Sequence, residues 1–341
     1  MTDIDPATNH IEWSTGGAGL KFGACGPDDE LLHPHVTQPG DTLSETWLYM
    51  WYVPEERISA FAYVWVHPNL GVLTSGLTVY QGHLEHPLEA EIFDIRAYLS
   101  ASLVREGGNG RDVRIPNGMR IQIIEPLQSI HLTYEDADRN HVVDVHFTAA
   151  SPPIMRENER HFDQVIRTQG RMVLAGREYR VDGFGLRDRS WGELRPEHPY
   201  PIPPYTWLTG TFAQSKLSWH LCAFDDPAQL PDWLDRMPVP EKIFREGWVY
   251  RDGEMLRLLE GTQLTTRDPQ SRRPLTVRVR LVDRRHRTYE IHGTLVASTS
   301  WSPWPNMRCR LGLARWEMAG EIGWGDIQEV HTGDYLRALK R

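Results

Sequence analysis

The feature that most constrains the fold of this chain is the alternation of apolar and polar residues with a period of two. Over residues 276–282, two valines and a leucine alternate with two arginines. The same alternation recurs in residues 141–147, 217–224 and 289–296. Successive side chains of a β-strand point to opposite faces, so each segment predicts a strand with one buried face.

Other segments support an all-β fold. Residues 47–53 and 61–66 are apolar at nearly every position, which predicts strands covered on both faces. Asp252-Gly253 predicts a tight hairpin turn. Helix signals are scarce: Pro227–Met237 is the best candidate, and residues 88–100 fit either a helix or a strand. Many short strands separated by turn residues are typical of barrels and sandwiches.

The chain length favours two domains. Single hydrophobic cores stop growing at roughly 250–300 residues, and this chain has 341. A short proline-bearing run at residues 149–153 precedes a highly charged segment, so we expect a boundary there. The expected domains are residues 1–152 and residues 153–341.

Charge and cysteine usage narrow the class of protein. The 37 basic and 46 acidic side chains give a net charge of −9, which argues against nucleic acid and anionic membranes as partners. Cys25, Cys222 and Cys309 are widely spaced and form no CxxC pair, as expected in a reducing compartment. The polar N-terminal residues and the lack of an apolar run near about 18 residues predict a cytoplasmic protein without an integral membrane segment.

The densest chemical cluster is residues 181–192, where Arg187, Asp188 and Arg189 lie between glycines and Trp191. Glycines 183, 185 and 192 predict close backbone contacts or positive φ angles. A buried Asp188 could remain protonated and act as an acid, whereas pairing with an arginine would make it a structural clasp. Neighbouring side chains on a strand face opposite ways, so Asp188 need not touch either arginine. Both interpretations remain open.

Further candidate residues lie elsewhere in the sequence. His67 follows an aromatic strand in which Tyr63 and Trp65 share its face, and it serves either as an acid–base group or as a turn cap. Aromatic side chains such as Trp191 either stabilise a cation or fill a core. The candidate catalytic residues are therefore Asp188, His67 and Tyr205, and the candidate substrate-binding residues are Trp191, Trp65, Tyr63, Trp207 and Arg187.

No sequence pattern predicts a metal or another cofactor. Asp144 and His146 share a strand face, but His141 falls on the opposite one and no third ligand has a recognisable spacing. Neither an HExxH motif nor a phosphate-binding loop occurs, and the glycines near residue 183 lack the helix that a dinucleotide fingerprint requires. Ser190 lies outside a nucleophile elbow.

Several segments resemble one bacterial family. They are His161-Phe-Asp-Gln164, Gly176-Arg-Glu-Tyr179, the motif at residues 183–192, and residues 45–53, 67–71 and 315–329. Together they are similar to the hydroxyneurosporene synthase (carotenoid 1,2-hydratase) and AttH-like proteins. This resemblance implies two lipocalin-like antiparallel β-barrels packed side by side. The family usually has histidine at the position of Arg189, so a proton-shuttling role there does not carry over.

Proteins of this architecture include hydratases, cyclases and lipid carriers that share a large apolar cavity, and a fold alone does not fix a function. Our leading hypothesis is a cofactor-independent lyase or isomerase with a cavity near the junction of its barrels. Asp188 would transfer a proton to a bulky apolar substrate such as a terpenoid or steroid. The alternatives are a non-catalytic carrier of the same kind of ligand, and a scaffold whose barrels are filled.

Overall fold

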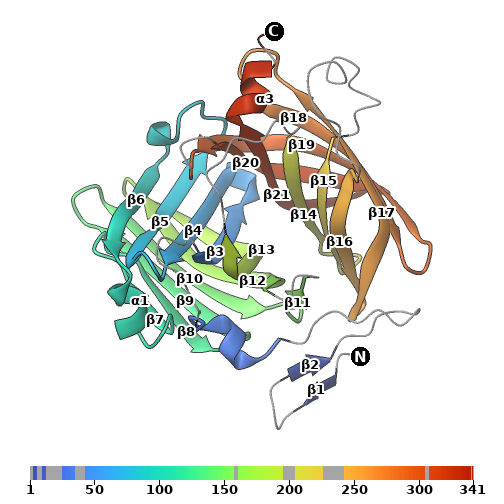
Figure 1. The fold of residues 1–341 in the computed structure, drawn as a ribbon. Helices are drawn as coiled ribbons and strands as arrows, with labels where there is room; N and C mark the ends of the chain where they lie inside the picture. Colours follow the sequence, from blue (N-terminus) through green and yellow to red (C-terminus); the bar gives the residue numbers. More distant parts are fainter. Residues whose placement is uncertain are drawn as a thin grey trace. The chain divides into compact units, whose positions relative to one another are not determined.

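The computed structural model describes residues 3–5, 10–12, 25–34, 43–156, 160–194, 204–225, 242–303, 307–338 and 340 (Figure 1). Its strands form two compact units. The first is built mainly from Lys21–Tyr80 and Ala90–Pro196, and the second mainly from Gln81–Glu89 and Glu197–Arg341. Strands β1 (Asp3–Asp5) and β2 (His10–Glu12) pair as a separate antiparallel ribbon.

The first unit is one large antiparallel sheet with the order β6-β5-β4-β3-β13-β12-β10-β9-β8-β7. Its strands are β3 (Leu43–Val53), β4 (Ile58–His67), β5 (Val72–Gln81), β6 (Ile92–Ser100), β7 (Asp112–Arg114), β8 (Arg120–Glu125), β9 (Ser129–Asp136), β10 (His141–Ala149), β12 (His161–Leu174) and β13 (Arg177–Leu194). The short β11 (Ile154–Met155) also pairs with β12. Because β3 pairs with β13, the first and last long strands of the unit are neighbours.

The sheet curls so that apolar side chains from most of its strands pack against one another in one core. Figure 1 shows β3 to β6 crossing β8 to β10, and a single buried cluster joins the two groups of strands. Tyr49 of β3 stacks on Phe147 of β10 with ring centroids 5.5 Å apart. The Trp51 indole donates a hydrogen bond to the sulfur of Met172, 3.2 Å away. The curled sheet therefore has a core face that bears these residues and an outer face that points away from them.

The two edge strands of this sheet, β6 and β7, are not paired with each other in the described part of the chain. Helix α1 (Ser102–Glu106) links them and buries Val104. The helix thus connects β6 and β7 where a closed barrel would have a ladder of hydrogen bonds between them. The first unit is therefore a curled half-barrel and not the closed barrel expected from the sequence. The first unit also contains the short 3₁₀ turns η1 (Pro27–Glu30) and η2 (Pro54–Glu56), and the second unit contains η3 (Pro87–Glu89).

The second unit is a closed antiparallel barrel of eight strands in sequence order. These are β14 (Tyr205–Phe212), β15 (Leu217–Phe224), β16 (Phe244–Arg251), β17 (Glu254–Arg267), β18 (Pro274–Asp283), β19 (Thr288–Trp301), β20 (Met307–Met318) and β21 (Glu321–Thr332). Strand β21 closes the barrel by pairing with β14, and helix α3 (Gly333–Ala338) follows it. Trp219 and Trp316 meet inside, with ring centroids 5.0 Å apart. A Cβ atom on Gly210 or Gly293 would collide with these indoles, so glycine makes room for tryptophan.

The structure confirms an all-β fold with lipocalin-like units, and it confirms the strands expected from the alternating pattern. Asp252 and Gly253 have φ angles of 52° and 80°, as a tight hairpin requires. Most of the ambiguous residues 88–100 form strand β6. The candidate helix Pro227–Met237 lies outside the described residues.

The expected boundary at residue 152 differs from the structure. Strands β12 and β13 follow that point, yet they pair with β10 and β3 and complete the first sheet. The first unit therefore extends to Pro196. The proline-bearing segment only connects two strands of one sheet, because turn residues mark strand ends as readily as domain ends.

Candidate functional site

Strand β13 divides the Arg187-Asp188-Arg189 motif between the two faces of the first sheet. Asp188 pairs in register with Asp163 of β12 and Leu48 of β3, and Leu48 pairs with Tyr63 of β4. Cross-strand partners project from the same face, so these four side chains form one row on the outer face. The two arginines project from the core face.

On the core face, both arginines are held by buried glutamates. Arg187 donates hydrogen bonds to the Oε2 atom of Glu30, at 2.9 Å, and to the side-chain oxygen of Gln164, at 2.7 Å. Arg189 pairs with Glu45 and lies 3.9 Å from the ring centroid of Trp47. We call these four residues, Arg187, Arg189, Glu30 and Glu45, the arginine clasp.

Burial and charge act in opposite directions on the clasp. Burial disfavours the charge of Arg187, but the Glu30 carboxylate outweighs it and raises the pKa of Arg187 above its usual value. Burial dominates at Arg189 and lowers its pKa, although Glu45 opposes this change. The clasp ties η1 and β3 to β13, so Arg187 has a structural role in the first unit.

The outer face carries a different cluster. The Nε2 atom of His161 lies 3.4 Å from a carboxylate oxygen of Asp188 and 3.8 Å from one of Asp163. Arg156 donates two hydrogen bonds to Asp163, at 3.1 and 2.8 Å. All four side chains are at most 9% exposed. We call Arg156, His161, Asp163 and Asp188 the histidine cluster.

The histidine cluster can move a proton. Arg156 balances the charge of Asp163. The other carboxyl group of the cluster, that of Asp188, lies beside the imidazole of His161. An imidazole exchanges protons near neutral pH, and a neighbouring carboxyl is a suitable partner for that exchange. The cluster therefore places an imidazole beside a carboxyl group, two side-chain types that proton-transfer chemistry uses.

Aromatic side chains extend the same face across β4. Tyr63 and Trp65 are buried and contact each other edge to face, with ring centroids 6.4 Å apart. The next residue on this face, His67, lies 4.9 Å from Trp65, and its Nδ1 atom is 3.2 Å from the carbonyl oxygen of Leu43. The structure thus brings Tyr63, Trp65 and His67 onto the face of Asp188, as the alternation along β4 predicts.

Trp191 lies elsewhere. It stacks on His33 with ring centroids 4.3 Å apart and packs edge to face on Phe162. Trp191 and Phe162 form a small buried cluster with Cys25, Leu127 and Met155 on the side of the clasp. Trp191 therefore fills a core, and the structure does not bring it to the carboxyl group of Asp188.

Tyr205 and Trp207 belong to β14 of the second unit. Leu208, the residue after Trp207, faces the barrel core, so by alternation Trp207 and Tyr205 both project outward. The Tyr205 hydroxyl donates a hydrogen bond to the sulfur of Cys222, 3.0 Å away. On neighbouring β21, burial raises the pKa of the outward-facing Asp326 to about 7, while a hydrogen bond with Gln328 acts against that change.

The sequence analysis missed Arg156, His161 and Asp163 as functional candidates. The spacing of His161 and Asp163, two residues apart on a strand, was a usable signal, because it places both side chains on one face. Their contact with Asp188 needed the register between β12 and β13, which a single sequence does not reveal. Arg156 directly follows β11, which pairs with β12, and so lies within reach of Asp163.

Comparison with known proteins gives the family first. The chain belongs to the family described as a domain of unknown function (DUF7064), whose sequence model matches residues 26–333. A search of curated proteins found no match.

Solved structures then show what the fold is similar to. An AttH-like protein of Nitrosomonas europaea (NE1406) superposes with a TM-score of 0.59 at 11% identity, covering 87% of this chain and 94% of that one. Kievitone hydratase from Nectria haematococca gives 0.53 at 13% identity, covering 87% and 90%. CghA gives 0.56 at 12% identity, covering 90% and 97%. These likenesses confirm an AttH-like fold. No helix among the described residues is long and apolar enough to cross a membrane.

Proposed function

We propose that this protein is a cofactor-independent lyase or isomerase that transfers a proton to and from a bulky apolar substrate. One observation carries the proposal: His161 contacts Asp188 on a buried face that also presents Tyr63 and Trp65. A buried acid–base pair beside aromatic rings suits chemistry that creates a cation away from water. A hydratase among the proteins of similar fold supports this class of reaction.

In the proposed reaction, the protonated Asp188 donates its proton to an alkene carbon of the substrate. The π electrons form the new C–H bond and leave a carbocation, and Asp188 becomes a carboxylate. Attack by water and transfer of one water proton to His161 give the hydrated product, whereas transfer of a proton from a neighbouring carbon to His161 gives an isomer. His161 returns the proton to Asp188. Dehydration is the reverse sequence, starting with protonation of the hydroxyl oxygen.

The substrate class follows from the side chains around the acid. Leu48, Tyr63 and Trp65 offer apolar surface, and an aromatic face stabilises a nearby cation by about 1–2 kcal/mol when water is excluded. These groups favour an isoprenoid skeleton such as a terpenoid or a steroid. His67 and Tyr205 remain proposed acid–base groups, and Trp207 remains a proposed substrate contact.

The test begins with native mass spectrometry of the freshly purified full-length protein and extraction of any bound compound. The extracted compound, or a panel of isoprenoid alkenes and alcohols, is then incubated with the protein in D₂O. Gain or loss of water and uptake of deuterium are read by mass spectrometry. We expect deuterium at the protonated carbon of the product.

Variants assign the roles. Asp188→Asn removes the acid, and we expect turnover to fall about 10²–10⁴-fold. The matched control is Asp182→Asn on the same strand, where an exposed carboxylate pairs with Arg167 and Arg180; its turnover should be unchanged. Full turnover by Asp188→Asn would exclude Asp188 as the acid. A tightly bound ligand that is never chemically altered would identify a carrier instead.

A further inference from the structure

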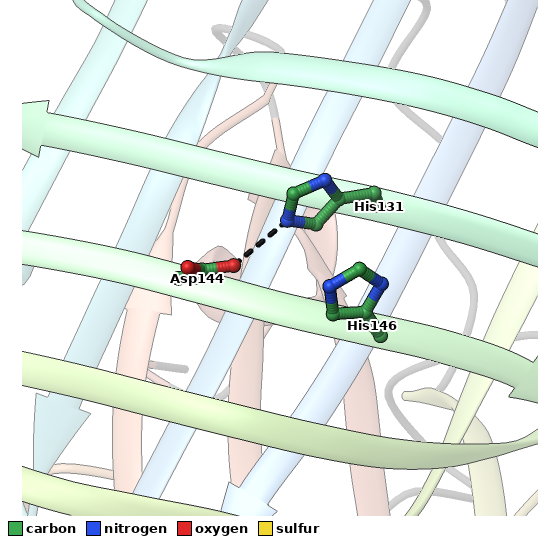
Figure 2. A group of neighbouring side chains, drawn as sticks. All are labelled: His131, Asp144 and His146. Carbon is green, nitrogen blue, oxygen red and sulfur yellow. Dashed lines mark hydrogen bonds and ion pairs between the residues drawn. The ribbon is translucent and has the colours of Figure 1, made fainter.

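A second group of titratable side chains lies on the outer face of the first sheet, on β9 and β10. Leu132, Val143 and Val145 of these strands are buried in the core. Their neighbours His131, Asp144 and His146 project the opposite way, as the alternation of strand side chains requires. Figure 2 shows the three side chains gathered on this face, with His131 reaching across from β9.

The three side chains are near enough to share a metal ion once one stacked imidazole rotates, because an ion must lie in the plane of each ring that binds it. The Nε2 atom of His131 is 2.7 Å from a carboxylate oxygen of Asp144. The rings of His131 and His146 stack in parallel, with centroids 3.9 Å apart. One potential ligand atom from each residue lies within 4.8 Å of the other two. Zinc bonds to nitrogen and oxygen are about 2.0–2.2 Å long, which places tetrahedral ligands roughly 3.3 Å apart. Rotation of partly exposed side chains closes this difference.

The charge of the surroundings also permits a cation. Gln122 pairs in register with His131, Gln169 pairs with His146, and Arg171 pairs with Asp144. Arg171 is the nearest cation in register, and its guanidinium is 3.4 Å from the carboxylate of Glu178.

The histidine cluster contains the same ligand types but is a poorer metal site. The Asp163 carboxylate already receives two hydrogen bonds from Arg156, so a cation occupies that position. Its ligands are also almost fully buried, whereas Asp144 is 43% exposed and gives an ion a direct path from solvent.

We propose that His131, Asp144 and His146 bind one divalent transition-metal ion, of the class of Zn²⁺ or Co²⁺, with water completing the coordination shell. Two imidazoles and one carboxylate form a ligand set that suits such ions and leaves a position open. The ion would cross-link β9 and β10 on the outer face. This site is separate from the histidine cluster and does not depend on the proposed reaction.

The experiment uses the full-length protein without a polyhistidine tag, stripped with EDTA and titrated with Co²⁺. The expected result is one bound ion per chain, with the visible absorption of a low-coordinate Co²⁺ site that Zn²⁺ displaces. His131→Ala, Asp144→Asn and His146→Ala should each weaken binding about tenfold or more. His292→Ala removes an exposed histidine of the second unit and should leave binding unchanged.

Unfolding midpoints of all variants, measured without metal, confirm that the variants are folded. The proposal is overturned if the wild-type protein develops no Co²⁺ absorption, or if His146→Ala binds Co²⁺ as the wild type does. It is also overturned if His161→Gln, rather than His146→Ala, abolishes binding, because the ion would then occupy the histidine cluster.

Discussion

The two faces of strand β13 use consecutive residues in opposite ways. Arg187 and Arg189 on the core face are fully buried, and each is matched by a glutamate. Asp188 on the outer face is almost as buried, yet the side chain beside it is the imidazole of His161. An arginine–glutamate pair has no proton to exchange near neutral pH, whereas a histidine–aspartate pair does.

This difference separates structure from chemistry within one motif. Removing one partner of a buried ion pair is costly because the remaining charge stays buried and unpaired. The clasp should therefore govern the stability of the first unit. The histidine cluster should govern reactivity and tolerate a neutral residue in place of Asp188. The following predictions test that contrast on a common scale, the free energy of unfolding.

The largest effect is expected for Glu30→Ala. Arg187 would lose its carboxylate partner inside the core, and we expect a loss of about 3–5 kcal/mol of stability. Urea unfolding followed by tryptophan fluorescence measures this loss. The double variant Glu30→Met with Arg187→Met removes both charges and should be markedly less destabilised. If Glu30→Ala unfolds at the wild-type urea concentration, the clasp does not hold the fold.

The next effect depends on pH and concerns Asp326, a buried carboxyl group whose pKa burial raises to about 7. As the pH rises from about 4 to 7, the unfolded chain loses this proton before the folded chain does, so the stability conferred by the protonated form declines. Asp326→Asn removes this titration. We expect it to gain roughly 2–4 kcal/mol at about pH 8 and nothing at about pH 4.

Thermal or urea unfolding at the two pH values checks this prediction. A gain of equal size at both pH values would mean that packing, and not ionisation, explains the effect of the Asp326→Asn variant.

A smaller effect is expected for Asp188→Asn. Asparagine keeps the shape of the side chain and an oxygen that can accept a hydrogen bond, so stability should change by less than about 1 kcal/mol. The same urea experiment measures it, with Asp182→Asn as control. A loss as large as that of Glu30→Ala would make Asp188 part of a structural clasp and would break the contrast between the two faces.

The smallest effect is expected for Arg139→Ala. Its guanidinium lies 2.6 Å from a carboxylate oxygen of Asp136, but the side chain is 70% exposed and water screens the pair. The unfolding midpoint should match that of the wild type within experimental error. A clear destabilisation would show that exposed pairs also contribute, and the clasp would then be less distinctive.

Local patterns predicted the fold well. Period-two alternation located β10, β15, β18 and β19, and the Asp252-Gly253 pair located a hairpin. Of the three glycines in the motif, Gly185 lies where a Cβ would meet the Met50 carbonyl, and Gly192 has a φ angle of 65°. Gly183 has neither constraint. The boundary prediction was less successful because it depended on which strands pair across the sheet.

The sequence by itself determined that Asp188 and its two arginine neighbours face opposite ways, because side-chain direction along a strand is a local property. It also determined the aromatic face of β4, on which Tyr63, Trp65 and His67 alternate with smaller residues. Only the tertiary structure decided the partners. Glu30 lies 157 residues from Arg187, and His161 and His131 reach their carboxylates from neighbouring strands. Those contacts depend on strand order and register, which are set by packing over the whole sheet.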